Sequence, residues 1–291
     1  MPDFLKEFFN QIINSLNVGS IYALIALGYT MVYGIVRLIN FAHGEILMIG
    51  AFTGYFLATT FSMSLIPLLL ISMLVCALIG MAIDRLAYKP LRNAPRMSAL
   101  ITALGVSMFL SNFFKWRFGA SDKIMPPMTL IGDIPMPNIT LITVILTVLC
   151  MVGLEFIVKK TKTGKAMRAV SLDKGAAQLM GINVDRTISI TFAIGSALGA
   201  VGGVLYSLNY GNLEPYMGSL PGLKAFVAAV LGGIGILPGA MVGGFVIGLV
   251  ETFVKAYINS SWANVFVFGI LILVLLVKPT GLFGKNIREK V

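Results

Sequence analysis

The chain has 291 residues, of which 57% are hydrophobic and only 12% are charged, and its formal net charge is +10. A soluble domain carries roughly a quarter charged residues, so this composition excludes an ordinary soluble enzyme or binding domain. Long continuous apolar runs predict an all-α polytopic integral membrane protein, because a membrane β-barrel is built from short segments of alternating polarity.

Apolar runs long enough to cross a bilayer recur along the chain. A crossing helix needs about 20 apolar residues, and such runs lie at 8–36, 46–61, 65–83, 97–114, 139–158, 188–209, 225–258 and 262–277. We therefore expect one transmembrane domain over 1–291, with about 8–9 helices. The start, MPDFLKEFFNQIINSL, lacks the pattern of a cleaved signal peptide, so the first run is expected to remain.

The segment INFAHGE at 39–45 places polar residues between two apolar runs, and two interpretations stay open. In the structural interpretation, a helix breaks near the inner membrane interface and its polar groups bond to backbone. In the functional one, Asn40, His43 and Glu45 belong to a gate or solute path at a discontinuous helix, whose ends face a zwitterionic solute. His43 and Glu45 are two residues apart, so they would point to different faces of a helix.

Metal and cofactor sites are not expected. Cys76 and Cys150 lie inside apolar runs without metal-ligand spacing, and the chain has a single histidine. Two isolated cysteines of this kind are typical of small buried side chains.

The basic stretch KKTKTGKAMRAVSLDKGAAQLMGINVDR, residues 159–186, is too polar to be a crossing helix. Within it, GAAQLMG at 175–181 follows Asp173 and ends at Gly181, which predicts a short capped helix. One interpretation is that Gly175, Ala176, Ala177 and Gly181 belong to a helix that docks into a groove on a cytoplasmic protein. The alternative is a loop that fixes orientation and contacts acidic lipid headgroups.

The basic residues predict the orientation. With the N-terminus outside and 225–258 counted as two crossings, all but six of the 22 basic residues fall inside; the six are Lys6, Lys115, Arg117, Lys123, Lys224 and Lys255. This bias follows the positive-inside rule. The loop 159–187 is therefore expected in the cytoplasm.

Glycines recur at helical spacing in the second half. Gly195, Gly199 and Gly203 form a ridge that allows close helix packing. The run 225–258 contains GGIGILPGA at 232–240, and these breakers predict two short helices or a re-entrant dip. Gly232, Gly233, Gly235 and Pro238 are thus further candidates for a path or gate, because irregular backbone inside a membrane must be buried or face water.

No motor is recognisable in the chain. The closest approach to a phosphate-binding loop is TGKA at 163–166, where Ala166 replaces the required hydroxyl residue. Acids within the apolar runs are few, chiefly Glu155 and Glu251, and Glu251 is spaced for an i,i+4 pair with Lys255. If the chain moves solute uphill, we expect a partner to supply the energy.

Several motifs together resemble one known family. NVGSIYALIALGYTMVYGIVRLINFAHGEILMIGAF (17–52), AFVAAVLGGIGILPGAMVGG (225–244) and LLVKPTGLFG (275–284) resemble the permeases of branched-chain amino acid ABC importers. GAAQLMG is similar to the coupling motif of ABC-importer permeases, with Gly175 where a glutamate is usual. The resemblance covers essentially the whole chain.

The resemblance implies a permease subunit that is not itself an enzyme and takes up leucine, isoleucine or valine across a bacterial inner membrane. Its implied partners are a second similar permease, two cytoplasmic ATPases and an extracytoplasmic solute-binding protein, with lipid around it and no nucleic acid. Alternatives are a permease for urea, short-chain amides or other amino acids, a stand-alone secondary carrier, and a membrane scaffold.

Overall fold

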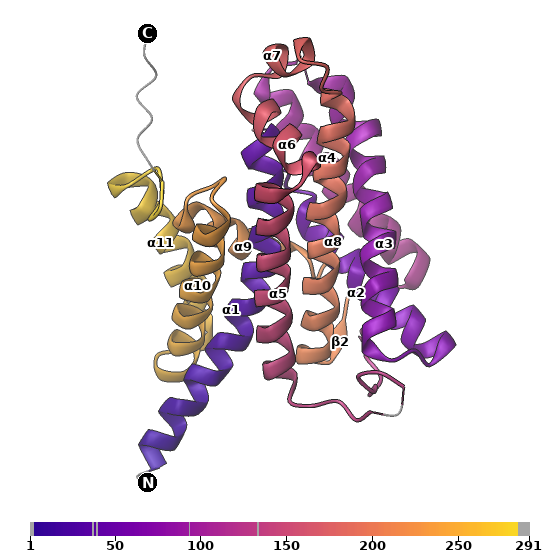
Figure 1. The fold of residues 1–291 in the computed structure, drawn as a ribbon. Coiled ribbons are helices and arrows are strands. Elements are labelled where there is room, and N and C mark those ends of the chain that lie inside the picture. Colours follow the sequence, from indigo (N-terminus) through magenta and orange to yellow (C-terminus); the bar gives the residue numbers. More distant parts are fainter. Residues whose placement is uncertain (1–2, 37, 39, 93, 133, 285–291) are drawn as a thin grey trace.

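The computed structural model describes residues 3–36, 38, 40–92, 94–132 and 134–284, and it is a bundle of helices with a small ribbon at one end (Figure 1). The long helices are α1 (Asp3–Val36), α2 (His43–Phe61), α3 (Leu65–Ile83), α4 (Arg96–Phe118), α5 (Ile139–Lys160), α8 (Val184–Tyr210), α10 (Leu237–Tyr257) and α11 (Ala263–Val277). The shorter ones are η1 (Asp84–Tyr88), η2 (Lys89–Leu91), α6 (Lys162–Leu172), α7 (Lys174–Leu179), α9 (Ser219–Gly232) and η3 (Ser260–Trp262). Strands β1 (Lys123–Ile124) and β2 (Asn212–Leu213) pair antiparallel.

The predicted all-α polytopic fold is confirmed. Among the described residues, eight helical segments are long and apolar enough to cross a membrane. Polar side chains cap several of the helices; for example, Asn138, Thr161 and Asn183 accept hydrogen bonds from first-turn amides of α5, α6 and α8. Each cap satisfies an amide that the helix itself leaves without a partner.

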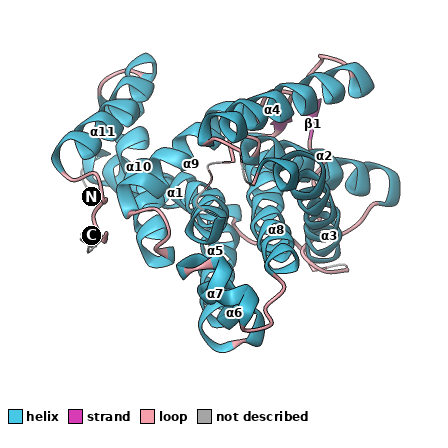
Figure 2. Ribbon diagram, turned by 90° about the horizontal axis from the view of Figure 1, so that it is seen from above, coloured by secondary structure: helices cyan, strands magenta, loops and turns pink. Residues whose placement is uncertain are grey.

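Helix α1 lies at the centre of the bundle, between α9 and α10 on one side and α5 and α8 on the other (Figure 2). Small residues let these helices approach closely. Gly195 of α8 lies against Gly28 of α1, whereas Gly199 and Gly203 lie against α2. A Cβ atom at Gly203 would lie 2.0 Å from the backbone oxygen of Leu47, so any side chain there would push α2 away.

The break expected in 225–258 is present, between Gly232 and Leu237, but the two halves differ from the prediction. Helix α10 has 21 residues and is long enough to cross. Helix α9 begins earlier than expected, at Ser219, and its 14 residues span about 21 Å, less than a hydrocarbon core of roughly 30 Å. Residues 214–218, which form hydrogen-bonded turns, connect β2 to the start of α9.

A second interrupted crossing precedes α2, and its position differs from the expected one. Of the two interpretations of INFAHGE, the structural one placed the helix break near the inner interface. Helix α2 instead begins at His43, whose ring lies against Gly28, eight residues or about 12 Å before the end of α1. The break is therefore inside the bundle.

Basic residues are distributed unequally between the two ends of the bundle. The α7 end holds Lys89, Arg92 and the basic stretch, whereas Lys115 and Lys123 lie at the opposite, β-ribbon end with the N-terminus (Figure 1). Arg37, Lys285, Arg288 and Lys290, which entered the predicted orientation, lie outside the described residues. Within the described residues, the eight crossing-length segments and the shorter α9 make nine passes between the two ends.

Candidate solute site and coupling helix

The starts of α2 and α9 meet inside the bundle. A Cβ atom at Gly218 would lie 2.1 Å from the backbone oxygen of Gly44, and one at Gly222 would lie 2.8 Å from the Cα of Gly44. Glycine is therefore required on both sides of this contact. Because both helices begin here, their positive dipole ends converge on one place within the membrane.

Glu45 occupies this junction and is 1% exposed. Its Oε1 accepts hydrogen bonds from the hydroxyls of Ser107 on α4 at 3.0 Å and Ser219 on α9 at 3.3 Å. Ser111 also faces the carboxylate, but its hydroxyl donates to the carbonyl of Ser107 at 3.0 Å. The other carboxylate oxygen of Glu45, Oε2, accepts no hydrogen bond from any described residue. A buried carboxylate without a counter-charge is costly, which makes Glu45 a functional candidate.

Asn40 and His43 lie on the other side of the α2 start. The backbone oxygen of Asn40 accepts from the His43 amide at 3.0 Å, and its Oδ1 accepts from the Tyr88 hydroxyl at 2.7 Å. The His43 ring packs edge-on against Tyr29, with centroids 4.8 Å apart, and its Nε2 has no hydrogen-bond partner in the described chain. Asn40 and His43 therefore fix the helix start, whereas Glu45 alone of the three lines the cavity at this junction.

The cavity beside Glu45 measures about 120 Å³. Its polar lining residues are Tyr29, Glu45, Ser107 and Ser219, and its apolar lining includes Phe41, Leu104 and Leu223. Leu104 and Leu223 are partly exposed on the outer surface of the chain. On the same surface the Tyr216 hydroxyl donates to Asn112 Oδ1 at 3.1 Å, and both residues are exposed. Asn112 lies within a helix of crossing length, and an exposed polar side chain there indicates a face covered by protein or water rather than lipid.

Gly232, Gly233, Gly235 and Pro238 lie at the opposite end of α9 and do not join Glu45. Gly233 and Gly235 have φ angles of +101° and +95°, which turn the chain sharply from α9 into α10. The turn is held from outside, because the amides of Leu282 and Phe283 donate to the carbonyls of Leu231 and Gly232 at 2.8 and 3.3 Å. Helix α9 thus connects the Glu45 junction to this turn.

A buried ion-pair cluster holds α9 in place. Glu251 of α10 accepts from Lys224 of α9 at 2.7 Å and from the Tyr22 hydroxyl of α1 at 2.7 Å. The expected i,i+4 pair with Lys255 is present at 2.6 Å, but Glu251 is 1% exposed and not a surface residue. No local pattern marked Lys224 as the partner of Glu251, because the two residues are 27 positions apart in the chain.

The short helix predicted in the basic stretch is α7. Asp173 Oδ1 accepts from the amides of Gly175 and Ala176 at 2.7 and 3.0 Å, and Gly181 ends the turn with φ +81°. Ala177 packs inward, while Gly175, Ala176 and Gly181 are exposed. Two apolar side chains that the motif does not include, Leu179 and Met180, are 90% and 82% exposed.

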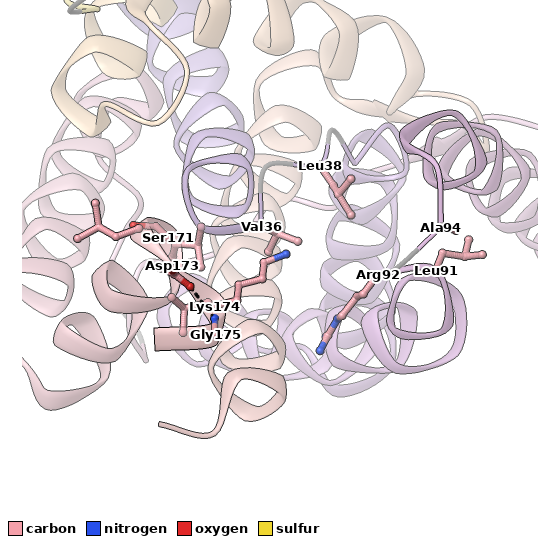
Figure 3. A pocket seen from close by; sticks show the side chains of 12 residues that line it. Val36, Leu38, Leu91, Arg92, Ala94, Ser171, Asp173, Lys174 and Gly175 are labelled. Carbon is pink, nitrogen blue, oxygen red and sulfur yellow. Dashed lines mark hydrogen bonds between the residues drawn. The ribbon is translucent and has the colours of Figure 1, made fainter. Parts of the chain in front are cut away.

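Open cavities flank α7. One of about 490 Å³ has Lys174 on one wall and Leu91 and Arg92 on the other (Figure 3). A second of about 650 Å³ lies between α7, the start of α8 and Lys89. Helix α7 therefore protrudes from the bundle, with open cavities on two sides and with its apolar side chains Leu179 and Met180 exposed.

An ion-pair network links the chain after α7 to the end of α3. Arg92 contacts both oxygens of buried Asp84, at 2.7 and 2.9 Å, and also pairs with Asp185 at the start of α8. Lys89 pairs with Asp185 at 2.8 Å, and Ser189 of α8 donates to Asp84 at 2.5 Å. A displacement of α7 would reach α3 through these contacts.

Comparison with known proteins decides the family. The model of the family described as branched-chain amino acid transport system, permease component, matches residues 11–276. The chain belongs to this permease family. It is 42% identical to the high-affinity branched-chain amino acid transport system permease protein LivH of Salmonella typhimurium and of Escherichia coli K12, over the full length of both chains.

Other permeases of this family are also similar. BraD of Pseudomonas aeruginosa, a high-affinity branched-chain amino acid permease, is 41% identical over the full length of both chains. No solved structure matches the chain.

Several site residues of this permease were not predicted from sequence. Ser107, Ser219 and Arg92 act through contacts between distant segments, and no local pattern marks them. Leu179 and Met180 carried a signal, since two large apolar side chains in a basic loop are unexpected unless a partner covers them.

Proposed function

We propose that the protein is the transmembrane permease subunit of an ATP-binding-cassette importer in a bacterial inner membrane, with leucine, isoleucine and valine as its substrates. Family membership supports the class, and the relatives' names support the substrates. The observation that carries the mechanism is α7, a capped helix that protrudes at the basic end with Leu179 and Met180 uncovered.

The partners follow from this role. Two cytoplasmic ATPases hydrolyse ATP, and one of them receives α7 with 159–187 as the coupling loop. A second, similar permease covers the surface around Leu104, Asn112 and Tyr216, and a solute-binding protein docks at the β-ribbon end. This chain performs no hydrolysis.

Coupling runs through contacts already described. ATPase closure pulls α7, the start of α8 follows, and the network of Arg92, Asp84 and Asp185 carries the movement to α3. The glycine contacts between α8 and α2 then shift the start of α2, where Glu45 lies. The helix junction would open toward one side of the membrane and close toward the other.

Reconstitution of the complete complex in liposomes tests the proposal. With internal ATP held constant, uptake of leucine, isoleucine and valine is expected to depend on the binding protein and to survive an uncoupler. Loss of uptake on uncoupling would instead favour a secondary carrier, for which buried Glu45 and Glu251 would be the natural proton sites. Uptake of urea or amides in place of these amino acids would change the substrate and leave the class intact.

A further inference from the structure

The cavity between α2, α4 and α9, which opens to the surface at Leu104 and Leu223, is a candidate binding site within the translocation path. We propose that it holds the α-amino-acid head group of the transported solute, with the carboxylate of Glu45 binding the α-ammonium group. This inference rests on the proposed function and names the residues that would contact the substrate.

Glu45 is suited to an ammonium group by its unequal environment. Ser107 and Ser219 anchor Oε1 from two different helices, while Oε2, in a residue that is 1% exposed, receives no hydrogen bond from the described part of the chain. The cation on the neighbouring helix is not available, because Lys224 pairs with Glu251 at 2.7 Å. A solute ammonium group would supply the missing charge and donors.

The first turn of α9 is suited to the solute carboxylate. Helix α9 has 14 residues and begins at Ser219, which lines the cavity. The dipole of a helix favours an anion at its start. The amides of Ser219 and Gly222 donate to the carbonyls of Tyr216 and Gly218, and Pro221 has no amide hydrogen, so the Leu220 amide is the backbone donor left for the solute carboxylate among the described residues of this turn. Glu45 and the α9 start lie on adjoining walls, so one small zwitterion can reach both. Two independent features, a buried carboxylate oxygen without a hydrogen-bond donor among the described residues and a helix start, thus face the same space.

The remaining walls accept an aliphatic side chain. Phe41, Leu104 and Leu223 line the cavity beside the polar groups. Its volume of about 120 Å³ is well below the roughly 300–1,000 Å³ of pockets for drug-sized ligands, which restricts the occupant to a small solute. An aliphatic α-amino acid combines both requirements, whereas a neutral amide would leave Glu45 without a cation.

The decisive variant is Glu45→Gln, which keeps the hydrogen-bond acceptor and removes the charge. In the complete reconstituted complex, labelled-leucine uptake is expected to fall about 10-fold or more, the range for one hydrogen bond to a charged group. ATPase activity stimulated by the loaded binding protein is expected to stay within about twofold of wild type, because α7 and its network are untouched. The matched control, Glu155→Gln, removes an α5 carboxylate that pairs with Lys159 and should leave both activities unchanged.

Three outcomes would overturn the inference. Wild-type uptake by Glu45→Gln would exclude a role for the charge, and an equal fall in stimulated ATPase activity would make Glu45 a structural tie between helices. If the Glu45→Gln complex fails to assemble, Leu104→Trp provides the test, because the larger side chain fills the cavity and leaves Glu45 in place. Normal leucine uptake by Leu104→Trp would then refute the proposed site. A wild-type complex that transports no leucine would refute the proposed function itself, which separates the two failures.

Discussion

The substitution Arg92→Met should destabilise the protein strongly, whereas Lys89→Met should not. The side chains of Arg92 and Asp84 are 12% and 0% exposed, and their two contacts are 2.7 and 2.9 Å. Removal of one partner from such a buried pair costs about 3–5 kcal/mol, because a charge stays buried without compensation. Lys89 and Asp185 are each 51% exposed, and a pair of that kind contributes about 0–1 kcal/mol.

The chain carries its own reporters for this measurement. Cys76 on α3 is fully buried and Cys150 on α5 is partly buried, so a thiol-reactive fluorescent dye follows thermal unfolding of the purified protein in detergent. Arg92→Met is expected to lower the Tm clearly and Lys89→Met to leave it nearly unchanged. Adding Asp84→Asn to Arg92→Met should recover part of the decrease in Tm, because the side-chain amide that this creates at position 84 needs no counter-ion. Equal Tm values for the two single variants would refute the assignment of the stabilising contact to buried Asp84.

Three further predictions concern α7 and the helix packing. Leu179→Ser should lower binding-protein-stimulated ATPase activity about 10-fold without loss of membrane assembly, because it removes an apolar anchor from α7. The control Gln178→Ser, on the same helix, should keep the wild-type ATPase activity. Equal ATPase activities of the two variants would show that α7 docks differently. Gly203→Val should reduce the yield of folded protein and destabilise it by about 1–3 kcal/mol in the thiol assay, whereas Gly153→Ala, with nothing within 4 Å, should be neutral. Asp173→Ala should remove the N-terminal cap of α7, which destabilises that helix by about 1 kcal/mol. The variant should bind the ATPase more weakly, so a higher ATPase concentration should be needed for half-maximal stimulation.

Local patterns in the sequence predicted the helices and one of the two breaks well. Apolar runs of sufficient length locate the crossings, and the breakers at 232–240 interrupt the chain where α9 ends at Gly232. The capped helix after Asp173 also follows from local chemistry, since its side chain satisfies the first amides. These features depend on residues close together in the chain.

Features that depend on distant residues were missed or misplaced. The depth of the break before His43 is set by the contact between Gly44 and Gly218, far apart in sequence. Glu45 was a candidate from the start, but its two serine anchors come from α4 and α9. Periodicity describes one helix at a time, so it cannot show which hydroxyls surround a carboxylate.

The hydrogen bonds that close α9 have a consequence for biogenesis. The carbonyls of Leu231 and Gly232 find their donors in Leu282 and Phe283, which follow only after α10 and α11 in the chain. During synthesis, the C-terminal carbonyls of α9 therefore obtain these hydrogen bonds only after α10 and α11 have been made. Until then α9 is a helix too short to span the membrane by itself. A chain truncated after Val277 lacks Leu282 and Phe283. We expect such a chain to be inserted with the end of α9 incompletely hydrogen-bonded and to be degraded by membrane proteases.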